Sequence, residues 1–82
     1  MYQLVYSKDV LRQLKKIDLN NRKRIITSLE RIRIRPYPHI KKLVGLPYFR
    51  LRVGKYRVIL DIKENKLIIQ VIEIGHRKNI YK

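Results

Sequence analysis

The end of the chain gathers residues that could act on a phosphate group. Residues 75–82 read GHRKNIYK and include His76, Arg77, Lys78 and Tyr81. Arginine binds phosphate oxygens through two parallel hydrogen bonds, histidine titrates near neutral pH, and a tyrosine ring stacks on unpaired bases. The cluster therefore indicates a phosphate site. The plain alternative is a basic terminus that only keeps the chain soluble.

A second group of cations falls on two strand-like runs, YFRLRV and YRVILDI. If residues 54–55 form a two-residue turn, Arg52 lies directly opposite Arg57, with Arg50 on the same side. Like charges directly opposite each other destabilise a sheet by about 0.2–1 kcal/mol. This arrangement predicts an anion site on a sheet face. Exposed arginines that bind nothing, with their methylene stems laid on the sheet, are the alternative.

Apolar spacing predicts one strand and two helices before these runs. Residues 2–6 alternate in polarity as a strand does, and Ser7 then stands at a helix N-cap position. A polar break at residues 18–21 separates the two helices, and Pro36 ends the second. The inward helical positions are expected to be Val10, Leu11, Leu14, Ile17, Ile25, Ile26, Leu29 and Ile32.

The remaining chain predicts a loop and a meander. Residues 35–47 hold three prolines and one glycine and are expected to form a loop. Residues 48–53, 56–62 and 67–74 follow as three antiparallel strands. The fold class is therefore α+β in the order β-α-α-β-β-β, with a small, mostly antiparallel twisted sheet and a helical hairpin on one face.

The register of the last strand has two solutions, because this strand is apolar on both faces. A two-residue turn at residues 64–65 would turn Leu67, Ile69 and Val71 towards the helices. A loop ending at Lys66 would instead turn Ile68, Ile72 and Ile74 inward, with Glu73 facing Arg57. We favour the second register because it brings Arg77 onto the same face as the other arginines.

Composition narrows the function. The 21 Lys and Arg against 6 Asp and Glu give a formal charge of +15, which favours a polyanion as partner. Nucleic acid comes first, ahead of a membrane surface or an acidic protein. There is no cysteine, and the six acids are scattered, so we expect neither a metal nor another cofactor. We expect residues 1–82 to form a single domain in the cytoplasm, because no signal peptide or membrane span is found.

These residues also carry a resemblance. The sequence resembles the RelE/ParE toxin superfamily, specifically the RelE-like mRNA endoribonucleases of toxin–antitoxin systems. The resemblance covers essentially the whole chain and is carried by KKLVGLPYFRLRVGKYRVIL and by the closing GHRKNIY. It implies a toxin that cleaves mRNA in the ribosomal A site, without a metal, and inhibits translation. It also implies an acidic RelB-like antitoxin as partner in a hetero-oligomer.

The resemblance implies roles for individual residues. Arg57 and Arg77 would bind the scissile phosphate, Tyr81 would stack on or orient the nucleotide, and His76 is a candidate for proton transfer. The residues expected to bind substrate are Arg50, Arg52, Lys55 and Lys78.

RNA supplies its own nucleophile, so the implied reaction is attack by a 2′-OH that leaves a 2′,3′-cyclic phosphate and a 5′-OH. The relatives typically have lysines where this chain has Arg50 and Arg52. A guanidinium, with a pKa above about 12, is a poor general base. A ParE-like inhibitor of DNA gyrase and a non-enzymatic nucleic-acid-binding module are the alternatives.

Overall fold

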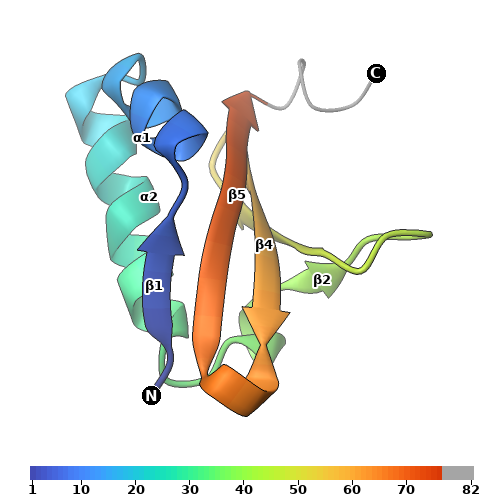
Figure 1. Cartoon of the computed structure of the whole chain (residues 1–82). Coiled ribbons are helices and arrows are strands. Elements are labelled where there is room, and N and C mark those ends of the chain that lie inside the picture. The colour runs from blue at the N-terminus through green and yellow to red at the C-terminus, as the bar shows by residue number, and fades with distance from the viewer. Residues whose placement is uncertain (77–82) are drawn as a thin grey trace.

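The computed structural model describes residues 1–76 of the chain and shows two helices on one side of a five-stranded sheet (Figure 1). The strand order is β1-β5-β4-β3-β2, with β1 parallel to β5 and the other neighbours antiparallel. The predicted α+β class and its helical hairpin are confirmed. The elements are β1 Gln3–Tyr6, α1 Lys8–Lys15, α2 Leu19–Ile32, η1 Tyr37–His39, β2 Lys41–Lys42, β3 Phe49–Val53, β4 Tyr56–Lys63, η2 Glu64–Lys66 and β5 Ile68–His76.

Capping side chains begin both helices. The Ser7 hydroxyl accepts a hydrogen bond from the Val10 amide at 3.1 Å, as the sequence predicted. At the start of α2, Asp18 accepts from the Asn21 amide at 3.2 Å. The helix ends at Ile32, ahead of Pro36. Both caps satisfy backbone donors that lack helical partners, and so they set where each helix starts.

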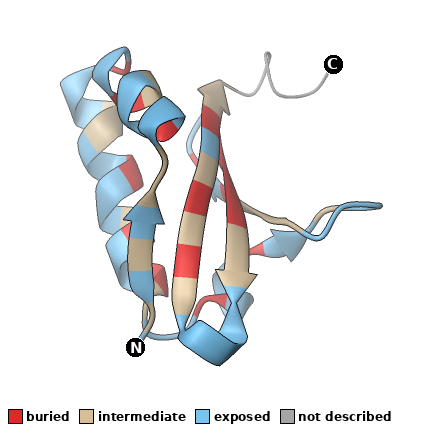
Figure 2. Ribbon diagram, in the orientation of Figure 1, coloured by how far each residue is buried: buried red, intermediate tan, exposed pale blue. Residues whose placement is uncertain are grey.

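The helices bury one apolar stripe each against the sheet (Figure 2). Val10 and Ile25 are fully buried, whereas Leu11 is 48% exposed and Ile26 is 38% exposed. The prediction that Leu11 and Ile26 face inward was therefore wrong. Neighbouring helical residues point about 100° apart, so only one of each pair can face the sheet. The core residues are Val10, Leu14, Ile17, Ile25, Leu29, Ile32, Ile40, Leu51, Val53, Val58, Leu60, Ile69, Val71 and Ile74.

The β3–β4 hairpin has the predicted register. Arg52 is directly opposite Arg57, and Val53 is opposite Tyr56. Gly54 opens the turn with a φ of +57°, a left-handed conformation that glycine adopts without steric cost. Leu51, Val53, Val58 and Leu60 are buried in the core beneath the helices, and the arginines alternate with them along β3 and β4. The arginines therefore lie on the sheet face away from α1 and α2, which we call the arginine face.

The last strand combines both candidate registers through a β-bulge. Ile69 and Val71 are buried beneath the helices, and after a register shift Ile74 is buried on the same side. The favoured register is therefore wrong for the first half of β5. Gly75, and not Glu73, is opposite Arg57.

The predicted loop at residues 35–47 contains a short 3-10 helix and the two-residue strand β2, which pairs with β3. Tyr37 anchors this segment in two ways. Its ring packs edge to face on that of Phe49, with the ring centroids 5.7 Å apart, and its hydroxyl donates a hydrogen bond to the Glu64 carboxylate. That hydrogen bond to a carboxylate raises the pKa of Tyr37 to about 12. Within residues 1–76, the helices are too short and too polar to span a membrane.

We predict that Gly54→Ala lowers the free energy of unfolding by about 1–2 kcal/mol, because an L-residue is strained at this φ. A Cβ at Gly54 would also lie 3.1 Å from Nη1 of Arg24. Gly45→Ala is the control, since Gly45 has a φ of +75° but open space around it. Urea unfolding should show a larger loss for Gly54→Ala. Equal stability of wild type and Gly54→Ala would contradict this description of the turn.

Candidate phosphate-binding site

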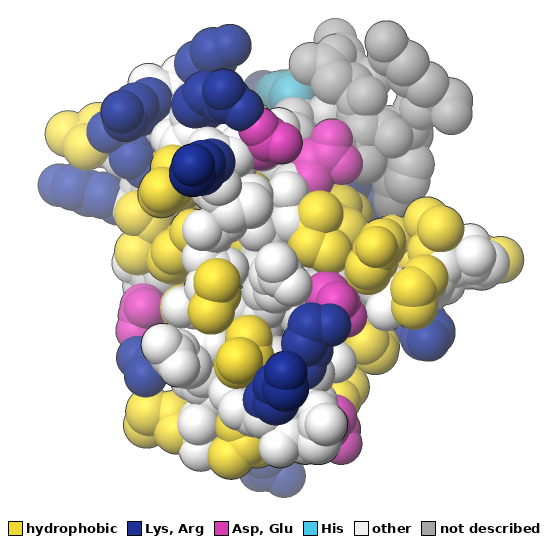
Figure 3. Space-filling view, in the orientation of Figure 1, with side chains coloured by type: hydrophobic (Ala, Val, Ile, Leu, Met, Phe, Trp, Pro, Cys, Tyr) yellow, Lys and Arg dark blue, Asp and Glu magenta, His cyan; other side chains and the backbone are white. Residues whose placement is uncertain are grey.

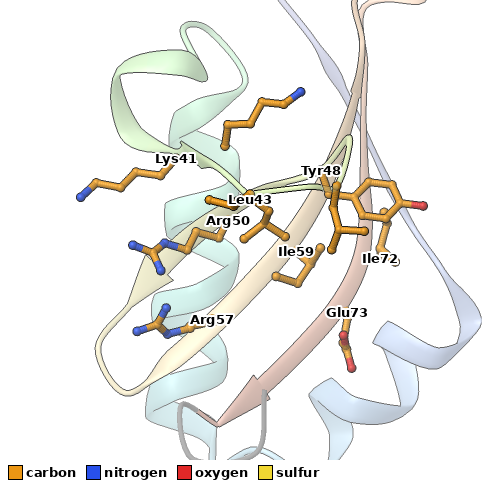
Figure 4. Close-up of a pocket in the computed structure, with 11 residues that line it drawn as sticks. Lys41, Leu43, Tyr48, Arg50, Arg57, Ile59, Ile72 and Glu73 are labelled. Carbon is orange, nitrogen blue, oxygen red and sulfur yellow. The ribbon is translucent and has the colours of Figure 1, made fainter. Parts of the chain in front are cut away.

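A cavity of about 620 Å³ lies on the arginine face, between the sheet and the segment that follows η1 (Figure 4). Strands β3, β4 and β5 form its floor, and β2 with residues 43–48 forms a wall. Because the core side of the sheet is filled by the helices, this face is where a ligand can approach. The lining residues are Lys41, Lys42, Leu43, Val44, Leu46, Tyr48, Arg50, Arg57, Ile59, Ile72 and Glu73.

Two of the predicted arginines meet in this cavity. Arg50 from β3 and Arg57 from β4 both line it, and Figure 4 shows their guanidinium groups pointing to the same end. Arg57 is only 6% exposed and is the one charged residue in the buried class among residues 1–76. A charge taken out of water acts on a ligand through a lower effective dielectric. Arg57 is therefore well placed to bind an anion strongly.

The opposite end of the cavity has a different character. Tyr48, Ile72 and Glu73 lie there, away from the guanidinium groups (Figure 4). The bulge in β5 brings Ile72 and its neighbour Glu73 into the same cavity, although strand residues next to each other normally point to opposite faces. A polarity gradient results, with an anion-binding end and an end suited to a planar or apolar group.

The sequence did not predict the apolar wall. Val44 is 99% exposed and Leu46 is 52% exposed, and both line the cavity from the projecting loop. Figure 3 shows hydrophobic side chains gathered on this loop. Two exposed aliphatic residues on either side of Gly45 are the signal that could have revealed it, because loop tips are usually polar. Lys41 and Lys42 were also missed, since β2 was not expected.

Three predicted residues lie elsewhere. Arg52 is opposite Arg57 but lines a second, smaller cavity beside α2, and the exposed turn residue Lys55 lines neither. His76 is opposite Tyr56, and the two rings meet edge to face at 5.5 Å. Directly paired residues share a sheet face, so His76 lies with Tyr56 on the helix side of the sheet, away from Arg57. Its proposed role in proton transfer stays a prediction.

Arg77, Lys78 and Tyr81 lie outside the described residues, so their predicted roles stay predictions as well. Within residues 1–76, no three His, Cys, Asp or Glu side chains gather in a way that could hold a metal ion. The described part of the site thus offers guanidinium and ammonium groups, one phenol, the Glu73 carboxylate and an apolar wall. Such a set can bind a phosphate together with the base attached to it.

The fold is shared with RelE toxins. The structure is similar to RelE in the archaeal RelE–RelB complex from Pyrococcus horikoshii OT3, with a TM-score of 0.83 and 22% identity over 95% of this chain and 97% of that chain. For the RelBE2 toxin–antitoxin complex of Mycobacterium tuberculosis, the TM-score is 0.85 and the identity 19%, over 93% and 98% of the two chains. For the RelB–RelE complex of Methanococcus jannaschii, the values are 0.73 and 29%, over 94% of each chain.

A family model described as ParE toxin of type II toxin–antitoxin system, parDE, matches residues 4–81. The chain therefore belongs to this family, and it is a type II toxin of the RelE/ParE superfamily. The resemblance inferred from sequence is confirmed. No curated protein matches the chain.

We predict that Arg50→Gln weakens binding of a single-stranded 2′-O-methyl oligoribonucleotide about tenfold or more, because it removes a charge-assisted hydrogen bond to phosphate. Lys55→Gln, which removes the same charge outside the cavity, should have a much smaller effect. Fluorescence anisotropy at fixed salt measures both affinities. Equal losses for the two variants would show that only net charge matters.

Proposed function

We propose that this toxin is a metal-independent endoribonuclease that cleaves mRNA on the ribosome and so inhibits translation. The observation that carries the proposal is the pairing of Arg50 and Arg57 at one end of a cavity whose other end is lined by Tyr48 and Ile72. The scissile phosphate would bind at the guanidinium end. The adjoining base would pack towards the phenol and the aliphatic wall, as unpaired bases do in RNA-binding proteins.

The chemistry needs no nucleophile from the protein. The 2′-oxygen of the ribose attacks the adjacent phosphorus, a bond forms between them, and the bond from phosphorus to the 5′-oxygen breaks. The 2′-OH loses its proton, and the leaving oxygen gains one. The products are a 2′,3′-cyclic phosphate and a 5′-OH. Arg57 and Arg50 would stabilise the negative charge that grows on the nonbridging oxygens, an effect that is strongest in a preorganised, partly dry site.

Proton transfer is the step least served by the described residues. Guanidinium groups are poor bases, the Glu73 carboxylate lies away from the Arg50 and Arg57 guanidinium groups, and His76 lies on the other side of the sheet. Arg77 and Tyr81 remain assigned to the phosphate and the nucleotide by resemblance alone. A site without a dedicated base suits a reaction in which the ribosome holds the 2′-OH in line with the leaving oxygen. Ribosome dependence is therefore part of the proposal.

An acidic antitoxin is the proposed protein partner. The solved structures from Pyrococcus horikoshii and Methanococcus jannaschii are complexes of a RelE with a RelB. In this chain the charge of +15 favours an acidic partner, and the cavity adds exposed aliphatic anchors beside its cations. An acidic segment with apolar side chains would cover the arginine face and inhibit the toxin. We propose that residues 1–82 form one domain that enters such a hetero-oligomer.

A second candidate is a ParE-like inhibitor of DNA gyrase, which the description of the matching family favours. The two activities predict different inhibition in purified systems. A ribonuclease stops translation of a programmed mRNA and leaves DNA supercoiling unaffected, whereas a gyrase inhibitor does the reverse. A non-enzymatic binding module would affect neither the mRNA chain length nor supercoiling.

We predict that Arg57→Ala reduces ribosome-dependent mRNA cleavage by about 10²–10³-fold, because it removes a donor aimed at the developing charge. Lys66→Ala, on the exposed η2 turn away from the cavity, should cleave like wild type. Primer extension on ribosome-bound mRNA measures the rates, and thermal unfolding checks that both variants are folded. Undiminished cleavage by folded Arg57→Ala would remove Arg57 from the site.

We predict that mRNA with a single 2′-O-methyl group at the cleaved position is not cut, since the attacking hydroxyl is blocked. The same message with the methyl group a few nucleotides away serves as the control and should be cut normally. Cutting of the methylated position at the control rate would exclude attack by the 2′-OH, even if the protein proved to be a nuclease.

A further inference from the structure

A second cationic cleft lies where α2 meets the turn between β3 and β4. Its volume is about 410 Å³. Residues of α2 form one side, and the end of β3 forms the other. Neither Arg57 nor His76, the predicted catalytic residues within residues 1–76, lines it. The lining residues are Lys23, Arg24, Thr27, Ser28, Arg31, Arg52, Val53 and Gly54.

The helical residues of the cleft lie on one surface of α2, since positions three and four apart adjoin on a helix. This surface is separate from the core stripe, because Ile25 and Leu29 are fully buried whereas Lys23, Arg24 and Arg31 are more accessible to solvent. From Lys23 to Arg31 the helix rises by about 12 Å. The cations therefore form a row and not a single point of charge.

The turn holds part of this row in place. A side chain at Gly54 would lie within 3.1–3.5 Å of three atoms of the Arg24 guanidinium, so this group sits directly against the turn glycine. Of β3, only Phe49 and Arg50 pair with β2. Within residues 1–76, the remaining residues Leu51–Val53 therefore form an edge of the sheet next to α2. Arg52 bounds the cleft at this strand edge, while its alternation with Leu51 and Val53 turns its side chain towards the arginine face.

Among the described residues, the charges in the cleft are all of one sign. No acidic residue within residues 1–76 lines it, and the acid on the same helix turn, Glu30, pairs with Arg33 at 2.8 Å. Thr27 and Ser28 add hydroxyl donors, which, like arginine and lysine, commonly contact phosphate oxygens. Of the lining residues in the described part of the chain, only Val53 is bulky and apolar. A peptide would find few anchors here, whereas the first cavity provides several.

We propose that this cleft binds the phosphate backbone of a structured RNA segment separate from the strand that is cleaved. A row of about 12 Å can face more than one phosphate, since the phosphates of each strand of a duplex recur about every 3.4 Å of helix axis. Arg52 lies at the border of the two regions, since it bounds the cleft and is opposite Arg57 in the sheet. The proposal rests on the proposed function in that RNA is the ligand, but it needs no cleavage.

The test compares two double variants that lose the same charge. Arg24→Gln with Arg31→Gln alters the cleft, and Lys8→Gln with Lys66→Gln alters lysines elsewhere on the surface. Binding of a duplex RNA with 2′-O-methyl riboses is measured over a range of salt concentrations. Such a duplex cannot be cut by attack of a 2′-OH, so the result does not depend on ribonuclease activity.

We expect the cleft variant to bind the duplex more weakly than the control variant. It should also flatten the slope of log K against log salt by about two, or one for each phosphate that the protein no longer neutralises. Ribosome-free binding of a short single strand at the first cavity should change little.

Equal slopes for the two double variants would overturn the proposal. It would also be overturned if the cleft variant lost affinity only for an acidic antitoxin peptide. If thermal unfolding shows that the Arg24→Gln, Arg31→Gln variant is not folded, the Lys23→Gln, Arg31→Gln variant replaces it in the same experiment.

Discussion

Burial of one sheet face beneath α1 and α2 is the constraint on which the rest of the structure depends. Because side chains alternate along a strand, placing Leu51, Val53, Val58 and Leu60 in the core turns the residues next to them towards the other face. Arg50 and Arg57 are among those positions. The hydrophobic effect that holds this small domain together therefore also places like charges together. An anion bound between them would offset the electrostatic cost of that placement.

Where local chemistry dominates, the sequence was sufficient. Ser7 at a helix start and Gly54 in a two-residue turn each favour one local conformation. The N-cap of α1 and the β3–β4 register could therefore be predicted from the residue types. The sequence was not sufficient where tertiary packing decides between equivalent choices. Leu11 and Ile26 each follow an equally apolar residue, so the sequence does not show which of the two faces the sheet. Strand β5 is apolar on both faces, so the alternation of residue types does not reveal its bulge. The apolar wall of the site comes from an exposed loop whose position depends on contacts such as that of Tyr37 with Phe49.

The chain presents two basic regions of different character. The cavity on the arginine face combines guanidinium groups with aliphatic and aromatic side chains, which suits a nucleotide in the proposed ribonuclease reaction and an acidic, partly apolar segment of the proposed antitoxin. The cleft on α2 offers cations and hydroxyls with little apolar surface, which suits a phosphate backbone. Competition between RNA and antitoxin for the first region, without competition for the second, would let the toxin be inhibited while part of its basic surface stays accessible.

The central claim is that the arginines of the uncovered face contact RNA phosphates directly. Arginine side-chain NMR, with the Nε–H signals assigned, tests it when a 2′-O-methyl single strand is titrated into the protein. The account predicts that the signals of Arg50 and Arg57 shift first and saturate together, while that of Arg12, which pairs with Asp9 on α1, stays in place. Shifts confined to arginines outside the cavity, with Arg57 unchanged at saturation, would contradict it.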